Sequence, residues 1–436
     1  MSEKNDFSIT SLGLCNFESP LSLLKYPEGH TFHFSDETEA ILVNDRLSNV
    51  IKTKSSKELP SLEMAGPRKN IFFNPKNVCI GIVTCGGLCP GLNNVIRDIV
   101  MVASYHYGVR RIYGFRYGYN GLVEENYILL TPESVKEIHE QGGSILSLSR
   151  GNQDPSRMVD GLVKLKVDIL FVIGGDGTMR GAIAIGEEIK KRNLKISIIG
   201  IPKTIDNDFK YMDQSFGFAS AYSKALEALD GAHREAQGAQ NGVGIVKLMG
   251  RHSGFIACMA TLASNQVNFT LIPEIPFKLD GPNGFLKVLE KRLEQRNHAL
   301  IVIAEGAGQD LLKNQGDERD ASGNIKFKDV GIFLTERIKD YFKHNNTEVN
   351  IKYIDPSYII RSIKANPPDS VLCTALALNA VHAGMAGKTE MIIAMYHRSL
   401  VHVPMHQAIS ERNLVKSTGP LWLSVIGATG QPLTFY

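Results

Sequence analysis

The chain has 436 residues, with 48 Lys and Arg against 45 Asp and Glu, which gives a net charge of +3. That balance is too small for nucleic-acid binding as the main activity, and 43% apolar residues exclude a disordered chain. Six cysteines are too few for a disulfide framework. The sequence shows no secretory signal, and no apolar run approaches the length of a membrane span, so we expect no membrane association.

Residues 1–75 differ from the rest and predict an N-terminal extension with a linker. A broken helical segment covers residues 21–26, and a short apolar patch covers residues 40–43. A stretch rich in Lys, Ser and Pro follows. Basic residues in such a stretch more often form a solvated surface than a binding patch.

From residue 76 onward, an apolar strand, a Gly-rich turn and a helix follow one another repeatedly. Continuous apolar strands, unlike alternating ones, indicate burial on both faces and are typical of a parallel sheet between helices. We therefore expect a first lobe over residues 76–215. Its strands are predicted at 78–83, 111–114, 168–173 and 196–201, and its helices at 95–104 and 178–191.

A second series with the same pattern predicts a second lobe over residues 216–364. Helices are expected at 219–235, 252–264 and 285–296, and strands at 243–249 and 300–304. A further apolar helix is expected at 370–386, and we expect residues 365–436 to pack back on the first lobe. The predicted fold is an α/β protein of two similar lobes with mostly parallel sheets and an N-terminal extension.

Five predicted strands end in polar or Gly-rich sequence. In parallel sheets, ligands bind beyond the carboxyl ends of the strands. One such end could be a simple turn, but five in one chain favour a shared cleft. The five segments are residues 84–94, 174–178, 202–208, 249–253 and 305–308.

The first of these segments contains Gly86-Gly87-Leu-Cys-Pro-Gly91. Its glycines let the backbone approach a ligand and present N–H groups at a helix start, which suits phosphate. It lacks the Lys-Ser/Thr ending of a P-loop, so a plain strand-to-helix turn remains an alternative. Cys85 and Cys89 have no second pair of thiols nearby and make a poor zinc site.

The second segment, GGDGT at residues 174–178, is a sharper signal. Its glycines leave room for a nucleotide polyphosphate. Asp176 suits Mg²⁺, which uses one or two carboxylates together with phosphate oxygens and water. Thr178 is expected to cap the next helix and to donate to phosphate. An Asx-type turn with a cap is the alternative.

The third segment, PKTIDND at residues 202–208, places two carboxylates beside a lysine. A positioned carboxylate can accept a hydroxyl proton, and Lys203 brings positive charge to a developing phosphoryl charge. In the last two segments, Arg251 suits a phosphate and Glu305 suits sugar hydroxyls. A polar loop or a structural salt bridge is the alternative in each case. We interpret His402 and His406 as structural.

The motifs TCGGLCPGLN, GGDGT, PKTIDND, MGR, EG and PSYIIR, in this order, closely resemble the phosphofructokinase family over about residues 67–436. AGPR-x-x-IFF-x-P together with KTIDND resembles the branch with plant and trypanosomatid ATP-dependent enzymes, which is related to the pyrophosphate-dependent enzymes. The resemblance implies a kinase that transfers phosphate from ATP to the 1-hydroxyl of fructose 6-phosphate in glycolysis, with Mg²⁺ as cofactor.

The resemblance also implies roles for individual residues. Asp206 matches the catalytic base, with Arg251 and Lys203 beside the transferred group, and Asp176 matches the residue associated with Mg²⁺. The positions that match the ATP site are Gly87, Arg150, Gly151, Gly175, Asp176, Gly177 and Thr178. The positions that match the substrate site are Thr204, Ile205, Asp206, Met249, Gly250, Arg251, Glu305, Lys352, Tyr358, Ile359, Ile360 and Arg361.

In this family, the residue after GGD distinguishes the enzymes that use ATP from those that use pyrophosphate. Gly177 leaves space for a nucleotide where an Asp would intrude, so ATP is favoured. A pyrophosphate-dependent enzyme and a non-catalytic regulatory subunit that binds sugar phosphate remain alternatives. Lys352 falls where bacterial enzymes have an Arg from a neighbouring subunit, which implies a homo-oligomer, either a dimer or a tetramer.

This chain departs from the best-known bacterial enzymes at three positions. Lys203 stands in place of a Gly, Tyr358 in place of a His, and Gly242 where an intersubunit Arg is expected. An allosteric enzyme is implied by the family, but its effectors do not carry over from the bacterial enzymes. Because the sequence shows no targeting signal, the expected location is the cytoplasm.

Overall fold

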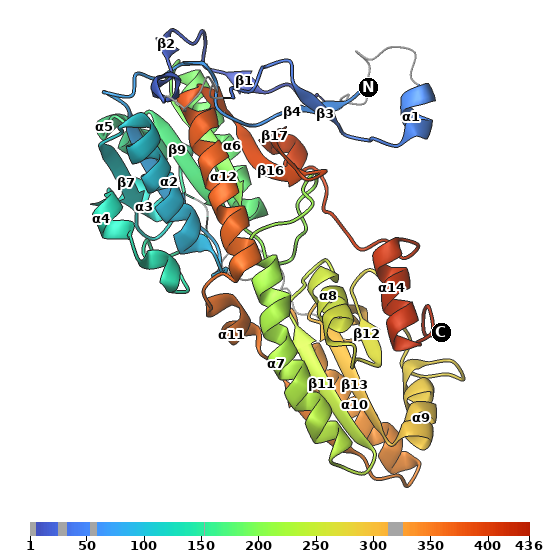
Figure 1. Ribbon diagram of the computed structural model, residues 1–436. Helices are drawn as coiled ribbons and strands as arrows, with labels where there is room; N and C mark the ends of the chain where they lie inside the picture. Colours follow the sequence, from blue (N-terminus) through green and yellow to red (C-terminus); the bar gives the residue numbers. More distant parts are fainter. Residues whose placement is uncertain (1–5, 25–32, 53–58, 152, 313–325) are drawn as a thin grey trace. The chain divides into compact units, whose positions relative to one another are not determined.

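The computed structural model describes residues 6–24, 33–52, 59–151, 153–312 and 326–436, and it divides into two compact units (Figure 1). Unit 1 comprises Met1–Thr204, Phe209–Gly217 and Ile363–Arg412. Unit 2 comprises Ile205–Asp208, Phe218–Ser362 and Asn413–Tyr436. The final residues therefore group with unit 2, whereas the sequence places residues 365–436 with the first lobe.

Unit 1 is built on a seven-stranded sheet with the strand order β17-β16-β10-β9-β6-β7-β8. Its five central strands are parallel, and the two outer strands β8 and β17 are antiparallel to their neighbours. Every residue of β6, β9 and β10 is buried, as the continuous apolar runs predict. The strands are β6 (Cys79–Thr84), β7 (Arg111–Phe115), β8 (Tyr127–Leu129), β9 (Ile169–Gly174), β10 (Ser197–Pro202), β16 (Met391–Tyr396) and β17 (Ser399–Pro404).

Helices cover both faces of this sheet (Figure 1). α2 (Leu92–Tyr107) and α12 (Pro367–Met385) pack together on one face, while α3 (Tyr119–Val123), α5 (Pro155–Lys164) and α6 (Asp176–Lys191) share a core on the other. β6 connects through α2 to β7 on one side, and β9 connects through α6 to β10 on the other. The strand order thus reverses between β6 and β9, and ligands of open α/β sheets bind at such a point.

Unit 2 contains a fully parallel sheet with the order β12-β13-β11-β14. Its strands are β11 (Gly242–Leu248), β12 (Phe269–Leu271), β13 (His298–Ala304) and β14 (Asn350–Ile354). Its long helices are α7 (Phe218–Gln237), α8 (Phe255–Ser264), α9 (Phe285–Arg296) and α10 (Val330–His344). α8 connects β11 to β12 at one edge of the sheet, and α10 connects β13 to β14 at the other edge. The direction of the connections therefore reverses between β11 and β13.

The shorter elements complete the two units. In unit 1 these are α4 (Pro132–Val135), the 3-10 helix η4 (Ile138–Glu140) and α13 (Met405–Ala408). In unit 2 they are the 3-10 helix η5 (Gln309–Leu311), α11 (Ser357–Ser362) and α14 (Pro420–Thr429). No helix within the described ranges is long and apolar enough to cross a membrane.

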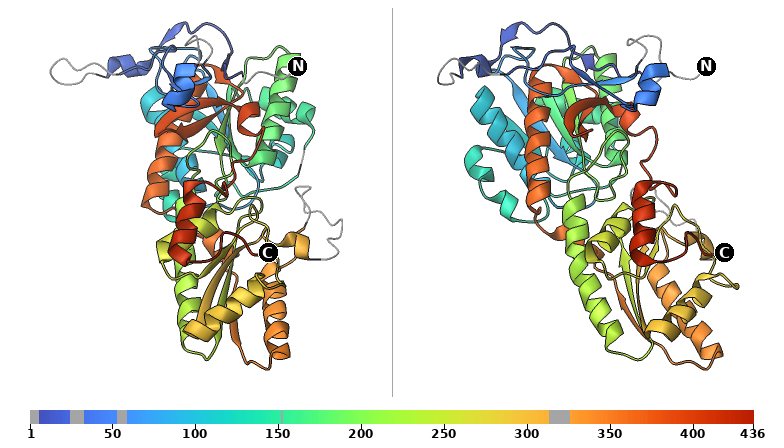
Figure 2. Two further views of the ribbon diagram at one scale, coloured as in Figure 1. Left: turned by 90° about the vertical axis from the view of Figure 1, so that its right-hand side faces the viewer. Right: turned by 45° about the vertical axis from the view of Figure 1, so that its right-hand side comes forward.

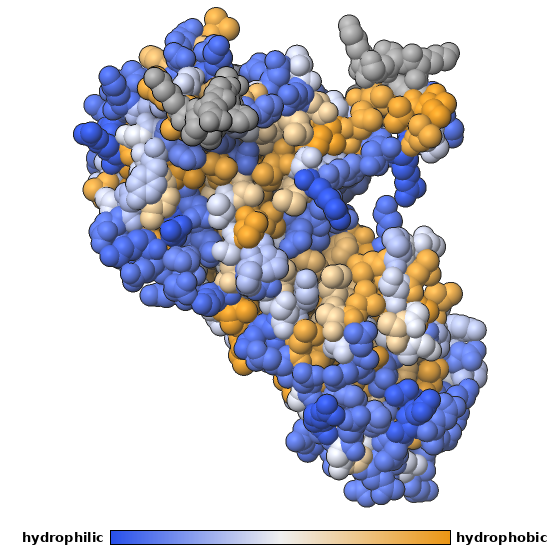
Figure 3. Space-filling model, in the orientation of Figure 1, coloured by the Kyte–Doolittle hydropathy of each residue, from blue (hydrophilic) through white to orange (hydrophobic). Residues whose placement is uncertain are grey.

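The N-terminal residues form short antiparallel pairs along unit 1 (Figure 2). β1 (Thr10–Ser11) pairs with β15 (Lys388–Thr389), β2 (Phe17–Glu18) with β5 (Asn70–Ile71), and β3 (Ala40–Leu42) with β4 (Ser61–Glu63). The helix expected at residues 21–26 is a 3-10 turn, η1 (Pro20–Leu23), and residues 25 and 26 lie outside the described residues. α1 (Leu47–Lys52) exposes Leu47 and Ile51, and Figure 3 shows this apolar surface.

A buried ionic cluster attaches β4 to the sheet. Glu63 accepts from Arg68 at 2.8 Å, from Lys388 at 3.0 Å and from His402 Nδ1 at 3.1 Å. Burial raises the pKa of Glu63, but the hydrogen bonds from His402 and Lys388 outweigh it and bring this pKa to about 2. His402 thus serves the attachment of β4.

Candidate active site

The loop after β6 is held beside the loop that carries Arg150 and Gly151. The Cys85 N–H donates to Ile173 O at the end of β9, and the Gly86 N–H donates to Ser149 O, both at 3.0 Å. None of the six cysteines forms a disulfide bond within the described residues, and burial raises the pKa of the Cys85 thiol to about 12. A thiol that stays protonated is a poor metal ligand.

Lys203 connects the ends of three neighbouring strands of unit 1. It follows β10, its backbone N–H donates to Gly174 O at 2.9 Å, and its Nζ donates to Gly87 O at 2.8 Å. The residue is only 7% exposed. Its ammonium therefore lies against the glycines of the loop after β6, and its backbone lies against the end of β9.

GGDGT turns from β9 directly into α6, which begins at Asp176 with Gly175 as its N-cap residue. The prediction that Thr178 caps this helix is wrong, because Thr178 already lies inside the first turn. It is 7% exposed, and its carbonyl accepts from the Tyr119 hydroxyl at 2.6 Å. At Gly177, a side chain would meet no described atom within 4 Å of its Cβ.

The carboxylate of Asp176 has one oxygen in ion pairs and one without a partner. Its Oδ2 lies 2.8 Å from Arg180 and 3.6 Å from Arg412. Its Oδ1 is buried and has no hydrogen-bond partner among the described residues. A buried acceptor without a donor is costly unless a ligand supplies one, so this oxygen fits a cation.

Mg²⁺ would have to take most of its ligands from phosphate and water. In the described part of the chain, no group of three or more His, Cys, Asp or Glu side chains could hold a metal ion. A single carboxylate with substrate phosphates is a usual Mg²⁺ arrangement, and Asp176 fits it.

In unit 2, Asp206 lies beside the start of the MGR segment. Ser253 Oγ donates to Asp206 O at 2.8 Å, and the Arg251 N–H approaches Asp206 Oδ2 at 3.5 Å, which is a long contact. The Arg251 guanidinium lies 4.2 Å from the ring centre of Phe327. This cation–π contact fixes the plane of the guanidinium.

The MGR and EG motifs fit together across neighbouring strands of unit 2. β11 and β13 pair in parallel up to Leu248 and Ala304, and the Gly306 N–H donates to Gly250 O at 3.1 Å. A Cβ at Gly306 would lie 2.1 Å from Arg251 O, so only glycine fits after Glu305. Burial raises the pKa of Glu305, although the charge of Arg251 opposes this shift.

The PSYIIR segment forms α11, which follows β14, the other neighbour of β11. Ile360 is fully buried and anchors this short helix, whereas Tyr358 is 77% exposed. The Arg361 guanidinium lies 4.8 Å from the ring centre of Tyr358. Lys352, on β14 itself, pairs with Glu235 of α7 at 3.7 Å.

The predicted residues therefore form one group in each unit. Unit 1 brings the ATP-site residues together with Lys203, and unit 2 brings Asp206 together with the sugar-site residues near the ends of β11, β13 and β14. The unit boundary falls inside PKTIDND, between Thr204 and Ile205. Thr204 O accepts from Ser215 Oγ at 2.5 Å, and Ile205 is 6% exposed.

Three contacts to these groups come from residues that sequence reasoning missed. Arg180 and Arg412 pair with Asp176, and Phe327 stacks on Arg251. Arg180 lies four residues after Asp176 on α6, a spacing that signals a helical ion pair. Arg412 and Phe327 lie far along the chain from their partners and carry no motif that could have identified them.

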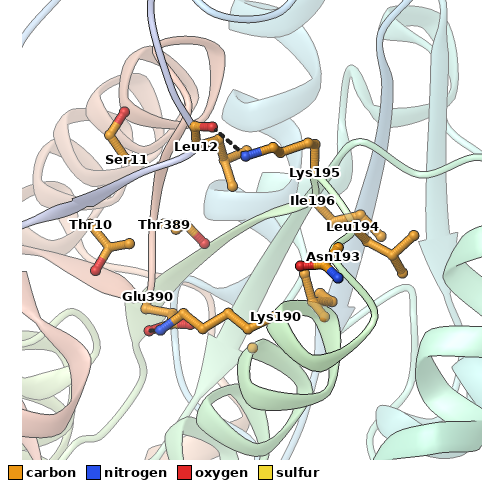
Figure 4. A pocket seen from close by; sticks show the side chains of 12 residues that line it. Thr10, Ser11, Leu12, Lys190, Asn193, Leu194, Lys195, Ile196, Thr389 and Glu390 are labelled. Carbon is orange, nitrogen blue, oxygen red and sulfur yellow. Dashed lines mark hydrogen bonds and ion pairs between the residues drawn. The ribbon is translucent and has the colours of Figure 1, made fainter.

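A separate pocket of about 250 Å³ lies near the amino end of β10 (Figure 4). Figure 4 shows Lys190 reaching Glu390 and Lys195 reaching the backbone of Leu12, at 2.6 and 2.8 Å. None of the predicted site residues lines this pocket. It is therefore distinct from the ATP-site group at the carboxyl ends of the strands.

Comparisons with known proteins agree with these motifs. The family model described as Phosphofructokinase matches residues 79–384. A protein of Borreliella burgdorferi named ATP-dependent 6-phosphofructokinase is 47% identical over 99% of this chain and 98% of its own. A protein of the same name from Trypanosoma brucei brucei is 45% identical over 90% of this chain and 81% of its own.

Solved structures show the same fold at low sequence identity. A pyrophosphate-dependent phosphofructokinase from Marinobacter aquaeolei superposes with a TM-score of 0.67 at 19% identity, covering 82% of this chain and 91% of that one. The predicted α/β fold with mostly parallel sheets is confirmed. The chain belongs to the phosphofructokinase family.

Proposed function

We propose that the chain is an ATP-dependent 6-phosphofructokinase, which phosphorylates the 1-hydroxyl of fructose 6-phosphate to give fructose 1,6-bisphosphate in glycolysis. The observation that carries the proposal is the likeness to enzymes of that name over nearly the whole chain, with every implied catalytic group present. That same completeness argues against a non-catalytic regulatory subunit, because Asp176 and Asp206 are both retained.

The residues of unit 1 would bind the phosphoryl donor. The glycines after β6 and β9 admit the phosphates close to the backbone, and the start of α6 offers N–H groups to them. Mg²⁺ held by Asp176 would neutralise phosphate charge. Lys203 provides a fixed positive charge for the group in transfer.

The residues of unit 2 would bind the sugar phosphate and accept its proton. Glu305 accepts from sugar hydroxyls, and Tyr358 to Arg361 hold the 6-phosphate. Asp206 removes the proton of the 1-hydroxyl as the hydroxyl oxygen attacks the γ-phosphorus, and Arg251 stabilises the charge on the phosphoryl oxygens. The contacts of Asp206 with the Ser253 hydroxyl and with the Arg251 backbone N–H support its positioning for this step.

The decisive experiment is the Asp206→Asn variant in an assay that measures fructose 1,6-bisphosphate formation. Loss of a general base should lower kcat by about 10²- to 10⁴-fold. Asp280→Asn, which changes an exposed carboxylate paired with Arg337, is the matched control and should retain wild-type kcat. A kcat near the wild-type value in Asp206→Asn contradicts the assignment.

A pyrophosphate-dependent enzyme is the second candidate, and Lys203 favours it, because pyrophosphate enzymes of the family carry Lys where the bacterial ATP enzymes have Gly. Gly177 favours ATP, and the ATP-using branch that the chain resembles also has Lys at that position. Replacing ATP by pyrophosphate in the same assay separates the two candidates: equal or higher kcat/KM with pyrophosphate would reverse our choice.

We also propose that the chain assembles as a homo-oligomer, a dimer or a tetramer, in which Lys352 reaches the substrate of a neighbouring subunit. Within the chain Lys352 is 44% exposed and makes only the long contact with Glu235 among the ion pairs of the described residues. Light scattering coupled to gel filtration measures the mass, and a monomer at assay concentration would contradict this proposal.

A further inference from the structure

Lys247 forms a buried ionic bridge in unit 2 that no predicted motif includes. It lies on β11, two residues before Met249, and is the half-buried position of a strand whose other residues are buried. Its Nζ lies 2.5 Å from Asp329 and 2.8 Å from Asp355. The Lys247 side chain is only 12% exposed, so these contacts are poorly screened by water.

The bridge is charged over the whole physiological pH range. Burial lowers the pKa of Lys247, but its hydrogen bonds to Asp329 and Asp355 outweigh burial and raise this pKa above its ordinary value. Burial raises the pKa of both carboxyls, but the hydrogen bonds that each accepts, with that from Lys247 as the largest, and the Lys247 charge together outweigh burial and lower each pKa. One ammonium therefore holds two carboxylates that would otherwise repel each other.

Each carboxylate also begins a helix. Asp329 is the N-cap residue of α10 and accepts from the N–H groups of Gly331 and Ile332 at 2.9 and 3.0 Å. Asp355 accepts from the Ser357 N–H at 3.1 Å, at the first residue of α11. Lys247 thus ties the starts of two helices to the end of β11.

The bridge reaches the end of β13 through one amide. Gln309 Nε2 donates to Glu305 O at 2.7 Å and to Lys328 O at 3.0 Å, and Lys328 directly precedes Asp329. Tyr353 on β14 adds a hydrogen bond from its hydroxyl to Asp329 at 2.8 Å. The ends of β11, β13 and β14 are therefore linked through the Lys247 bridge.

We propose that Lys247 is a positioning residue for the sugar phosphate. Its ammonium holds α11, and with it Tyr358 to Arg361, in register with Arg251 and Glu305. The inference rests on the proposed function, because it takes these residues as the sugar-phosphate site. Without the ammonium, Asp329 and Asp355 repel each other, the start of α11 moves, and the 6-phosphate loses its ligands.

The test compares Lys247→Met, Lys247→Arg, Asp355→Asn and the Lys247→Met/Asp355→Asn double variant. For Lys247→Met we expect the KM for fructose 6-phosphate to rise roughly 10- to 100-fold, as for loss of a residue that orients ligands. The KM for ATP should stay within about twofold, because the ATP-site residues belong to unit 1. Lys247→Arg keeps a cation and should recover most of the affinity.

Coupling between the two residues gives a readout that a general loss of stability does not produce. If Lys247 acts through Asp355, Asp355→Asn raises the KM for fructose 6-phosphate on its own, and the double variant binds no worse than Lys247→Met. Lys287→Met, which removes a lysine paired with Glu290 on α9, is the matched control and should leave both KM values unchanged.

An unchanged KM for fructose 6-phosphate in a folded Lys247→Met, or an equal rise in both KM values, overturns the proposal. Should Lys247→Met not fold, Asp355→Asn decides alone, and an unchanged KM there overturns it. Titration calorimetry measures the affinity for fructose 6-phosphate without catalysis, so a failure of this proposal can be told apart from a failure of the proposed function. Wild-type protein that binds the sugar phosphate without phosphorylating it refutes the kinase, while the ratio of variant to wild-type affinity still tests Lys247.

Discussion

The Gly177→Asp variant tests whether the second residue of α6 selects the phosphoryl donor. In the structure, a Cβ at this position meets no described atom within 4 Å, so the added carboxylate does not clash with its own chain. An acid in the first turn gains about 0.3–1 kcal/mol from the helix dipole, and loss of a helical glycine adds about 0.5–1 kcal/mol. The free energy of unfolding should therefore not fall.

The Gly177→Asp substitution should weaken the use of ATP and leave the binding of fructose 6-phosphate unchanged. A carboxylate about 5 Å from one phosphate charge, at an effective dielectric constant of about 20, repels it by about 3 kcal/mol. That energy corresponds to a loss of roughly 100- to 300-fold in kcat/KM for ATP. The KM for fructose 6-phosphate should stay near its wild-type value, because its proposed ligands belong to unit 2.

The assay is steady-state formation of fructose 1,6-bisphosphate with ATP, together with thermal unfolding. Gly177→Asn adds nearly the same volume without the charge and so separates bulk from repulsion. Gly231→Asp on α7 is the matched control, since its Cβ also meets no described atom within 4 Å. Unchanged kcat/KM for ATP in a folded Gly177→Asp would falsify the donor argument.

Three further predictions follow from charges in the two units. Lys203→Met should lower kcat by about 10²- to 10³-fold, as expected for loss of one preorganised donor; a kcat within threefold of wild type in the folded variant excludes that role. Because burial raises the pKa of Glu305, the KM for fructose 6-phosphate should rise more steeply in the wild type than in Glu305→Gln as the pH falls from 7 toward 5, where the 6-phosphate titrates in both; parallel profiles exclude this role of Glu305. The pKa of Glu63 is about 2 against an ordinary 4.5, so its contribution of about 3 kcal/mol is present above pH 4.5 and is lost as the pH falls toward 2. Urea unfolding of Glu63→Gln should thus show a large deficit at pH 7 that shrinks at pH 3, and a constant deficit would contradict this linkage.

The strands that position the candidate site were predictable because they are buried on both faces. β6, β9, β10, β11 and β13 each lie within about two residues of a continuous apolar run. Such a run has few other structures to adopt when Gly-rich turns bound it.

The strands that were missed lie nearer the edges of the sheets. β14 has the sequence NIKYI and no fully buried residue. It therefore lacks the continuous apolar run by which the central strands were predicted. β16 and β17 form a hairpin whose turn residues, His397 and Arg398, both have positive φ, at 47° and 62°. That turn normally requires Asn or Gly, so the sequence gives no hairpin signal there.

The loops of the candidate site could be predicted from the sequence, but the distant residues that contact them could not. Gly-rich and acidic segments after buried strands identified Asp176, Asp206 and Glu305 from local sequence alone. Arg412 pairs with Asp176, and Phe327 lies against Arg251, only because tertiary structure brings distant segments together. Local propensity does not encode such pairs.

The attachment of β4 to the sheet has a consequence for biosynthesis. Glu63 and Lys388 are separated by 325 positions along the chain, so β4 reaches its partners near the carboxyl end only after almost the entire polypeptide has emerged. Contacts between such remote segments slow folding, because a long loop must close first. Until then, the backbone of residues 64 and 65, which later bonds to β17, stays open to pairing with other nascent chains, and a chaperone that shields it would raise the yield of active protein.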